Sequence, residues 1–323
     1  MAGRGNMVTG NLQLTDDIRQ KLAMNCMMMT ALSEVAVRGR PAVDVIMPAE
    51  QTLPAVFASP HSGTEYPPEF VAQSRLQFPA LRRSEDSFVD ELFACAPAFG
   101  APLVRATFPR AFVDPNREPF ELDPAMFEDE LPAFVNTGSP RVAAGLGTIA
   151  KVVANGEEIY ARPLRFTEAK RRIDAYYRPY HDALRQVLTA TRTRFGCCLL
   201  IDCHSMPSVG GPMERDAGRA RVDFVLGDCH STSCDKMVIA RAERALRDLG
   251  YAVARNTPYS GGFVTQHYGR PIDGLHALQI EINRALYMDE AAIARGPGFA
   301  VLAERLKTLV RVLGDVAVEF ARA

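Results

Sequence analysis

The chain has 323 residues, of which 47% are hydrophobic and 23% are charged. This composition is typical of a globular protein with a large buried core, and it argues against disorder, a collagen-like fibre or a membrane protein. Lys and Arg number 37 against 38 Asp and Glu, a formal net charge of -1. Without a basic excess, neither a nucleic acid nor an anionic membrane surface is an expected partner, so a small molecule is the expected one.

The seven cysteines are an odd number, and no two of them have a CxxC spacing. Reduced thiols and a cytoplasmic location are therefore expected. Residues 1–48 are expected to be an N-terminal extension, partly helical or disordered, which is either a loosely packed leader or a helix through which copies associate. No secretory signal or membrane span is expected, and the number of subunits is left open.

From about residue 54, short apolar runs alternate with longer amphipathic ones, as in a mainly parallel sheet covered by helices. The Pro179 ring is expected to kink one long helix, residues 168–195. The sequence thus predicts an α/β fold, a single domain over 49–323 with helices on both faces of a mixed, mainly parallel sheet. The expected strands are 54–59, 102–107, 197–202, 222–226, 251–255 and 275–282, and the expected helices are 85–98, 168–195, 233–249 and 294–321.

Two histidines follow predicted strands, His61 after the first and His204 after the central one. Open α/β sheets bind ligands at the carboxyl ends of their strands, so two histidines at equivalent ends favour a shared metal site. A catalytic zinc usually has three protein ligands, and a carboxylate should complete the set. Glu85, Asp86 and Asp90 are the candidates, although acids at a helix start can also merely complement the helix dipole.

A second polar cluster, Arg110, Asp114, Asn116 and Arg117, follows the second predicted strand. Arginine suits bidentate carboxylate recognition, so Asn116 and Arg117 could hold a substrate carboxylate. An internal ion pair between Asp114 and an arginine explains the same residues equally well.

The loop from Tyr259 contains a double glycine, Gly261 and Gly262, which suits close approach to a ligand. Glu281 interrupts the last apolar strand, where a lone carboxylate is costly unless it is paired or functional. Cys203 adjoins His204, but neighbours on a strand point to opposite faces, so they are not expected to form a nucleophile and base pair.

Together these stretches resemble the N-formylglutamate amidohydrolases, zinc enzymes similar in fold to the carboxypeptidase A group. The resemblance covers about residues 54 to 315 in the order of the family. The matching stretches are Pro60–Gly63, Asp86, Arg110 to Arg117, Asp202–Ser205, Tyr259–Gly262, His267–Gly269, Gln279–Glu281 and Arg284 to Met288.

The resemblance implies a role for each matching residue. His61, Asp86 and His204 would be the ligands of one zinc ion, with Glu85 in reserve for Asp86. Glu281 would be the general base and Arg110 would polarise the scissile carbonyl. The expected substrate-binding residues are Asn116, Arg117, His267, Ser205 and Gly262.

The implied reaction is zinc-dependent hydrolysis of N-formyl-L-glutamate to formate and L-glutamate, in histidine degradation. A glutamate substrate needs a second cation, for which Arg141, Arg162 and Arg165 are the candidates. The alternatives are a deacylase or carboxypeptidase acting on another N-acyl amino acid, and a non-catalytic small-molecule-binding relative.

Overall fold

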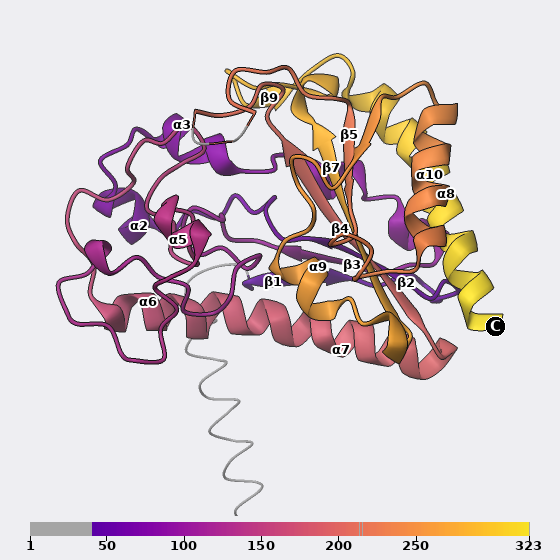
Figure 1. Cartoon of the computed structure of the whole chain (residues 1–323), viewed down its shortest axis with the longest axis horizontal. Coiled ribbons are helices and arrows are strands. Elements are labelled where there is room, and N and C mark those ends of the chain that lie inside the picture. The colour runs from indigo at the N-terminus through magenta and orange to yellow at the C-terminus, as the bar shows by residue number, and fades with distance from the viewer. Residues whose placement is uncertain (1–40, 213, 215, 323) are drawn as a thin grey trace, which may run out of the picture. The chain divides into compact units, whose positions relative to one another are not determined.

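A seven-stranded mixed sheet forms the middle of the fold (Figure 1). The computed structural model describes residues 41–212, 214 and 216–322, and the compact unit that holds the sheet begins at Ala42. Strands β3, β2, β4 and β7 run parallel, whereas β1 is antiparallel to β3 and β5 to β7. In sheet order the strands are β1 (Val43–Ile46), β3 (Leu103–Ala106), β2 (Ala55–Ser59), β4 (Cys198–Met206), β7 (Leu275–Asn283), β5 (Phe224–Gly227) and β6 (Val253–Arg255).

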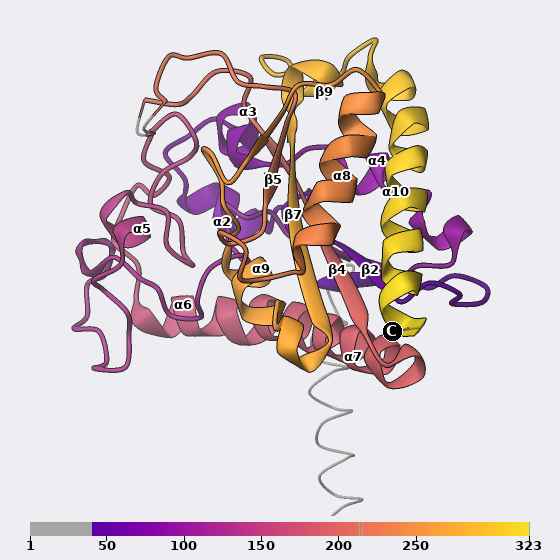
Figure 2. The ribbon, with the colours of Figure 1, turned by 45° about the vertical axis from the view of Figure 1, so that its right-hand side comes forward.

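Helices cover both faces of the sheet, so the predicted α/β fold class is confirmed. On one face α8 (Lys236–Asp248) and α10 (Phe299–Arg322) lie side by side, as Figure 2 shows, with the short α4 (Val89–Leu92) next to them. On the other face lie α6 (Phe166–Arg172), α7 (Arg178–Phe195) and α9 (Phe263–Tyr268). Shorter elements are α2 (Pro68–Gln73), α3 (Phe78–Leu81), α5 (Pro140–Ala143), β8 (Met288–Asp289) and β9 (Ala294–Arg295).

The strand residues sort between two apolar cores by the alternation of side chains along a strand. In β4, Ile201 and Cys203 pack with α8 and α10, while Leu200 packs with α7. Cys203 and His204 therefore point to opposite faces, as expected, and their side chains do not form a reactive pair.

The predicted long helix runs from Phe166 to Phe195, but a π-helical turn at Ile173–Tyr177 interrupts it between α6 and α7. The turn lies directly before Pro179, which has no N–H to donate to the preceding turn. The predicted disturbance near Pro179 thus takes the form of one widened turn.

Two predicted helices differ from the structure. The helix expected over 85–98 is wrong: α4 and a 3₁₀ turn at Ala96–Phe99 replace it, because Phe88 has a left-handed backbone (φ 67°) and Pro97 interrupts the run. α10 begins at Phe299 rather than at 294, since Ala294 and Arg295 pair with β8 before the helix starts.

At the N-terminal side, the sheet includes β1, which precedes residue 49, the expected start of the domain. Residues 1–40 of the expected extension, with Cys26, lie outside the described residues. The six described cysteines have free thiols. Within the described residues, no helix is long and apolar enough to cross a membrane.

The loop that carries His61 is pressed against the backbone after β3. A Cβ on Gly63 would lie 2.2 Å from the carbonyl oxygen of Phe108 and 2.4 Å from the carbonyl carbon of Thr107. Only glycine fits this approach, so the sequence Ser62-Gly63 fixes how close the loop lies to the sheet.

We expect Gly63→Ala to lower the free energy of unfolding by roughly 2 kcal/mol or more, because overpacking against backbone costs about 1–3 kcal/mol. Urea denaturation of both proteins measures this difference. Gly138→Ala is the matched control, since among the described residues nothing lies within 4 Å of a Cβ at that position. Equal unfolding midpoints for the two variants would contradict the argument.

Candidate metal centre and active site

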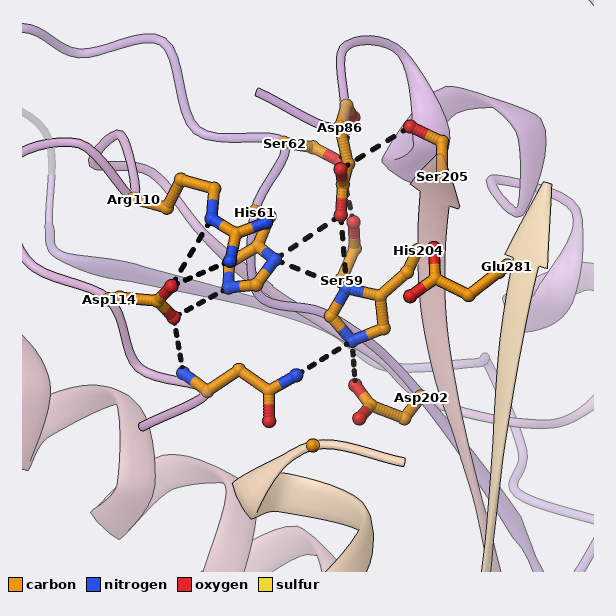
Figure 3. Close-up of polar contacts among 12 residues, drawn as sticks. Ser59, His61, Ser62, Asp86, Arg110, Asp114, Asp202, His204, Ser205 and Glu281 are labelled. Atoms are coloured by element: carbon orange, nitrogen blue, oxygen red, sulfur yellow. Dashed lines mark hydrogen bonds and ion pairs between the residues drawn. The ribbon is translucent and has the colours of Figure 1, made fainter. Parts of the chain in front are cut away.

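Three side chains from separate parts of the chain meet at the carboxyl ends of the central strands (Figure 3). His61 stands in the loop after β2, Asp86 in the loop before α4, and His204 near the end of β4. β4 extends to Met206, so His204 lies within the strand rather than after it. All three side chains are buried, with at most 2% of each residue exposed.

The three facing atoms have the spacing of metal ligands. His61 Nδ1 lies 3.2 Å from Asp86 Oδ2, His204 Nδ1 lies 3.0 Å from the same oxygen, and the two Nδ1 atoms lie 3.1 Å apart. In a tetrahedral zinc site with metal–ligand distances of about 2.0–2.1 Å, neighbouring ligand atoms are about 3.3 Å apart. Two imidazole nitrogens and one carboxylate oxygen are also a ligand set that zinc favours. The residues therefore fit one divalent metal ion of the zinc type.

Each histidine has a second carboxylate behind it. His61 Nε2 lies 2.7 Å from Asp114 Oδ1, and His204 Nε2 lies 2.9 Å from Asp202 Oδ1. At His61 the hydrogen bond to Asp114 holds the proton on Nε2 and leaves the lone pair of Nδ1 for a metal.

The carboxylates around the imidazoles of His61 and His204 favour the binding of a cation between the two rings. Burial would lower the pKa of His204, but Asp202 and Asp86 raise it well above its usual range. Burial would raise the pKa of Asp86 and of Asp114, yet the histidines and, for Asp114, Arg110 hold both pKa values well below their usual range. Two carboxylates with lowered pKa values thus face the two imidazoles in a buried place.

The second oxygen of Asp86 is turned away from the histidines. Asp86 Oδ1 accepts hydrogen bonds from Ser205 Oγ at 3.3 Å and from Arg284 Nη2 at 3.2 Å. Arg284 Nε also donates to Ser205 Oγ at 3.1 Å. Ser205, expected to bind substrate, lines the cavity but places its hydroxyl on the candidate ligand instead.

Glu85, the alternative to Asp86, points elsewhere. It pairs with Arg82, whose Nη2 donates to Glu85 Oε2 at 2.9 Å, and it accepts a hydrogen bond from Tyr66 Oη at 2.7 Å. Asp90 pairs with Arg105 at 2.7 Å. Of the three acids that the sequence left open, the structure brings only Asp86 to the histidines.

Glu281 stands next to His204 across the pairing of β4 with β7, and its carboxylate is turned toward that histidine (Figure 3). Burial raises the pKa of Glu281 to about 7. A carboxyl group with a pKa near the working pH is suited to general acid–base chemistry.

These groups share one cavity of about 370 Å³. It is lined by His61, His204 and Glu281, by the predicted substrate-binding residues Asn116, Arg117, Ser205 and Gly262, and by Arg110, Arg141, Gln279 and Arg284, among others. The structure therefore brings together nearly all the residues singled out by the sequence.

The polar cluster after β3 contains the expected internal ion pair, and it also brings Arg117 to the cavity. Arg110 pairs with Asp114, with Nη2 2.7 Å from Oδ2, as the internal ion pair requires. Arg117 instead donates to carbonyl groups, of Leu146 at 2.7 Å and of Asn116 at 2.8 Å, and faces the cavity. Neighbouring helix residues support this loop: Tyr177 Oη donates to the Arg117 carbonyl at 2.9 Å, and His181 Nε2 lies 2.9 Å from the Pro115 carbonyl.

Gly262 packs against Asn116, and a Cβ there would lie 2.3 Å from Asn116 Nδ2. The Asn116 amide is oriented by Val264, whose N–H donates to Oδ1 at 2.8 Å. Its Nδ2 therefore faces His204 Nε2 at 3.2 Å. Gly262 thus shapes the site by allowing close packing of the loop.

His267, expected in the substrate pocket, does not line the cavity that holds the candidate site. Its ring stacks on Phe263, with centroids 4.9 Å apart, and lines a separate cavity of about 400 Å³ beside α7. Phe263 and His267 are one turn apart on α9, whereas Val264 and Thr265 on another side of that helix contact the site.

Three participants carried no predicted role: Asp202, Gln279 and Arg284. Asp202 stands two residues before His204, and residues two apart on a strand share a face, so that spacing is a usable signal. Gln279 has the same relation to Glu281. Arg284 reaches Asp86 only through the fold, 198 residues away in sequence.

The family model of the N-formylglutamate amidohydrolases matches residues 53–288. The chain belongs to this family. Two curated relatives named N-formylglutamate deformylase are 28% identical over 241 residues in Pseudomonas putida and 29% identical over 276 residues in Pseudomonas aeruginosa. These alignments cover 74% and 84% of this chain, and 83% and 94% of the relatives.

The crystal structure of an N-formylglutamate amidohydrolase from Ralstonia eutropha JMP134 has a similar fold, with a TM-score of 0.77 and 37% sequence identity. The match covers 88% of this chain and 99% of that chain. The resemblance seen in the sequence and the prediction of an amidohydrolase are confirmed.

We expect Asp86→Asn and His204→Ala to lose stoichiometric zinc, because each removes one of three ligands. Metal analysis after dialysis measures the zinc content. Glu85→Gln is the matched control and should keep its zinc, since Glu85 binds Arg82 and Tyr66. Added zinc should raise the Tm of the wild type but not of the ligand variants.

A fully zinc-loaded His204→Ala protein would contradict the site. If Glu85→Gln lost its zinc and Asp86→Asn kept it, the third ligand would be Glu85.

Proposed function

We propose that this family member hydrolyses N-formyl-L-glutamate to formate and L-glutamate with one zinc ion, in histidine degradation. The observation that carries the proposal is a single cavity lined by both histidines of the candidate metal triad, by Glu281 and by several guanidinium groups. The named deformylase relatives support the substrate. The free thiols of the described cysteines support a cytoplasmic location.

A divalent metal held by His61, Asp86 and His204 would supply Lewis-acid polarisation and a water of lowered pKa. Glu281 accepts the proton of the attacking water and delivers it to the departing amino nitrogen as the C–N bond breaks. Arg110, fixed by Asp114, stabilises the negative charge that develops on the carbonyl oxygen. The hydroxyl of the water ends in formate and its proton on glutamate, so the hydrolysis balances.

The charge of the cavity favours a substrate with two carboxylates. Asp114 compensates Arg110, but the hydrogen bonds of Arg117 and of Arg141 go to neutral carbonyl groups. Burial, together with nearby Arg141 and Arg110, lowers the pKa of Arg117 to about 10. Arg117 has only a long contact with Asp114 Oδ2, at 3.9 Å, and no described carboxylate forms an ion pair with Arg141. The two guanidinium groups are therefore a counterpart to the two carboxylates of N-formylglutamate.

Of the three cations considered for the side-chain carboxylate, only Arg141 lines this cavity. Arg162 lines a small cavity elsewhere, and Arg165 pairs with Glu128 at the surface. We therefore assign the α-carboxylate to Asn116 and Arg117, and the side-chain carboxylate to Arg141.

If Glu281 is the base, Glu281→Gln should lower kcat at least about 100-fold with little change in KM or zinc content, because the amide keeps the shape but accepts no proton. Steady-state kinetics and metal analysis measure both. Glu121→Gln is the control: Glu121 is equally buried but does not line the cavity, and its variant should keep normal kcat. A Glu281→Gln enzyme with most of its turnover would remove Glu281 from the mechanism.

The Arg141 assignment predicts a loss of selectivity. Arg141→Met should lower kcat/KM for N-formylglutamate by about 30-fold or more, the equivalent of roughly 2 kcal/mol, because a buried carboxylate loses its charged partner. N-formylglutamine, which lacks that charge, should be hydrolysed at an unchanged rate. Arg162→Met and Arg165→Met are the matched controls and should behave as wild type.

An equal fall on both substrates would show that Arg141 does not read the side-chain carboxylate. Comparison with N-acetylglutamate separates a deformylase from a general deacylase. Equal kcat/KM values for the formyl and acetyl compounds would favour the deacylase.

A further inference from the structure

Gln279 is a buried side chain of the site that the proposed mechanism does not use. It stands on β7 two residues before Glu281, so both side chains point to the same face of the strand. Only 4% of Gln279 is exposed. A buried amide in the middle of an apolar strand is costly unless its polar atoms are bonded, so its contacts are informative.

The contacts of Gln279 fix the orientation of its amide. The backbone N–H of Gly262 donates to Gln279 Oε1 at 2.7 Å. Because a backbone N–H can only donate, the oxygen must face Gly262 and the NH₂ group must face the other way. That NH₂ group donates from Nε2 to Glu281 Oε1 at 2.9 Å.

The hydrogen bond from Gln279 holds one oxygen of Glu281. None of the described residues donates to the other oxygen, Oε2, and Glu281 lines the cavity. A carboxylate held at one oxygen cannot rotate freely about its last bond, so Oε2 keeps one direction. Proton transfer requires hydrogen-bond geometry between base and water, and a fixed direction favours it.

The same short segment also supports a candidate metal ligand. Thr265 Oγ1 donates to Asp202 Oδ2 at 2.9 Å, and Asp202 is the carboxylate behind His204. Across the strands, Asp202 pairs with Gln279 and His204 with Glu281. The segment that begins α9 thus makes two hydrogen bonds to the site. Gly262 bonds Gln279, which contacts Glu281, and Thr265 bonds Asp202, which lies beside His204.

We propose that Gln279 is the positioning residue of Glu281: it holds Oε1 so that Oε2 faces the water to be activated. This rests on the proposed function, in which Glu281 is the general base. Gln279 is given no contact with the reacting atoms, so its effect must pass through Glu281.

The test is a double-mutant cycle with Gln279→Met and Glu281→Gln, measured with N-formylglutamate on zinc-loaded protein. Gln279→Met has nearly the same size but no donor, and we expect kcat to fall about 10- to 100-fold, with KM within threefold of wild type and zinc content unchanged. In the Glu281→Gln background the same substitution should cause no further fall, because the group it positions has already lost its function.

The matched control is Gln51→Met, the same change at another buried glutamine, which donates to Thr191 Oγ1 at 2.8 Å and does not line the cavity. It should leave kcat and KM unchanged. Gln279→Asn is a second variant for the case that Gln279→Met does not fold. Its amide is one methylene shorter and withdraws from Glu281, so kcat should again fall with KM retained.

Three outcomes would overturn the proposal. A kcat of Gln279→Met within twofold of wild type excludes a positioning role. A further fall in the Glu281→Gln background shows that Gln279 acts independently of the base. Loss of zinc or a large rise in KM shows a structural or substrate-binding role. Full activity of Glu281→Gln by itself, in contrast, refutes the base assignment in the proposed function.

Discussion

The pairing of β4 with β7 is the constraint on which the site depends. Nine residues of each strand are in parallel register, from Cys198 beside Leu275 to Met206 beside Asn283. In that register His204 lies beside Glu281, and Asp202 beside Gln279. Because side chains alternate, a slip of one residue would turn Gln279 and Glu281 to the face opposite Asp202 and His204. The backbone ladder therefore sets the distance between His204 and Glu281 before any side-chain contact forms.

The carboxylates of Asp86 and Asp114 can be buried at this edge because each contacts histidine and arginine side chains. Asp86 has the two histidines and Arg284, and Asp114 has His61 and Arg110. An unpaired buried charge would cost several kcal/mol, so the loss of any member affects its neighbours. The site is thus a connected network of charges, and its candidate metal ligands cannot be treated as independent of their neighbours.

Sequence patterns predicted much of the fold because they report burial directly. The apolar runs gave the six strands from β2 to β7 within a few residues, and the helical repeat gave the long helix beside them. The run over 85–98 has a helical period too, but a left-handed residue at Phe88 and a proline at 97 prevent one helix, and neither effect shows in periodicity. β1 is short and half exposed, which leaves little apolar signal to detect.

The sequence predicted the candidate site residues where a polar side chain follows or interrupts an apolar strand, as for His61, His204 and Glu281. The choice between Glu85 and Asp86 was not, because two adjacent acids in a loop differ only in the direction that the loop gives them. The choice among Arg141, Arg162 and Arg165 likewise depends on how a long connection folds over the sheet. The sequence also could not show that His267 faces another cavity, because the direction of a side chain on a six-residue helix follows from its packing.

The π-helical turn between α6 and α7 lets the two halves of one long helix pack against different surroundings. Before the turn, Arg172 is buried among Phe70, Phe112 and Tyr160. After it, Tyr177 and His181 contact the carbonyl groups of Arg117 and Pro115 in the loop that lines the cavity. One extra residue in a turn shifts the angular phase of all that follows by about 100° relative to an uninterrupted α-helix. The widened turn therefore rotates the side chains of α7 relative to those of α6. As a result Arg172 points into the core, while Tyr177 and His181 point to the loop of Pro115 and Arg117.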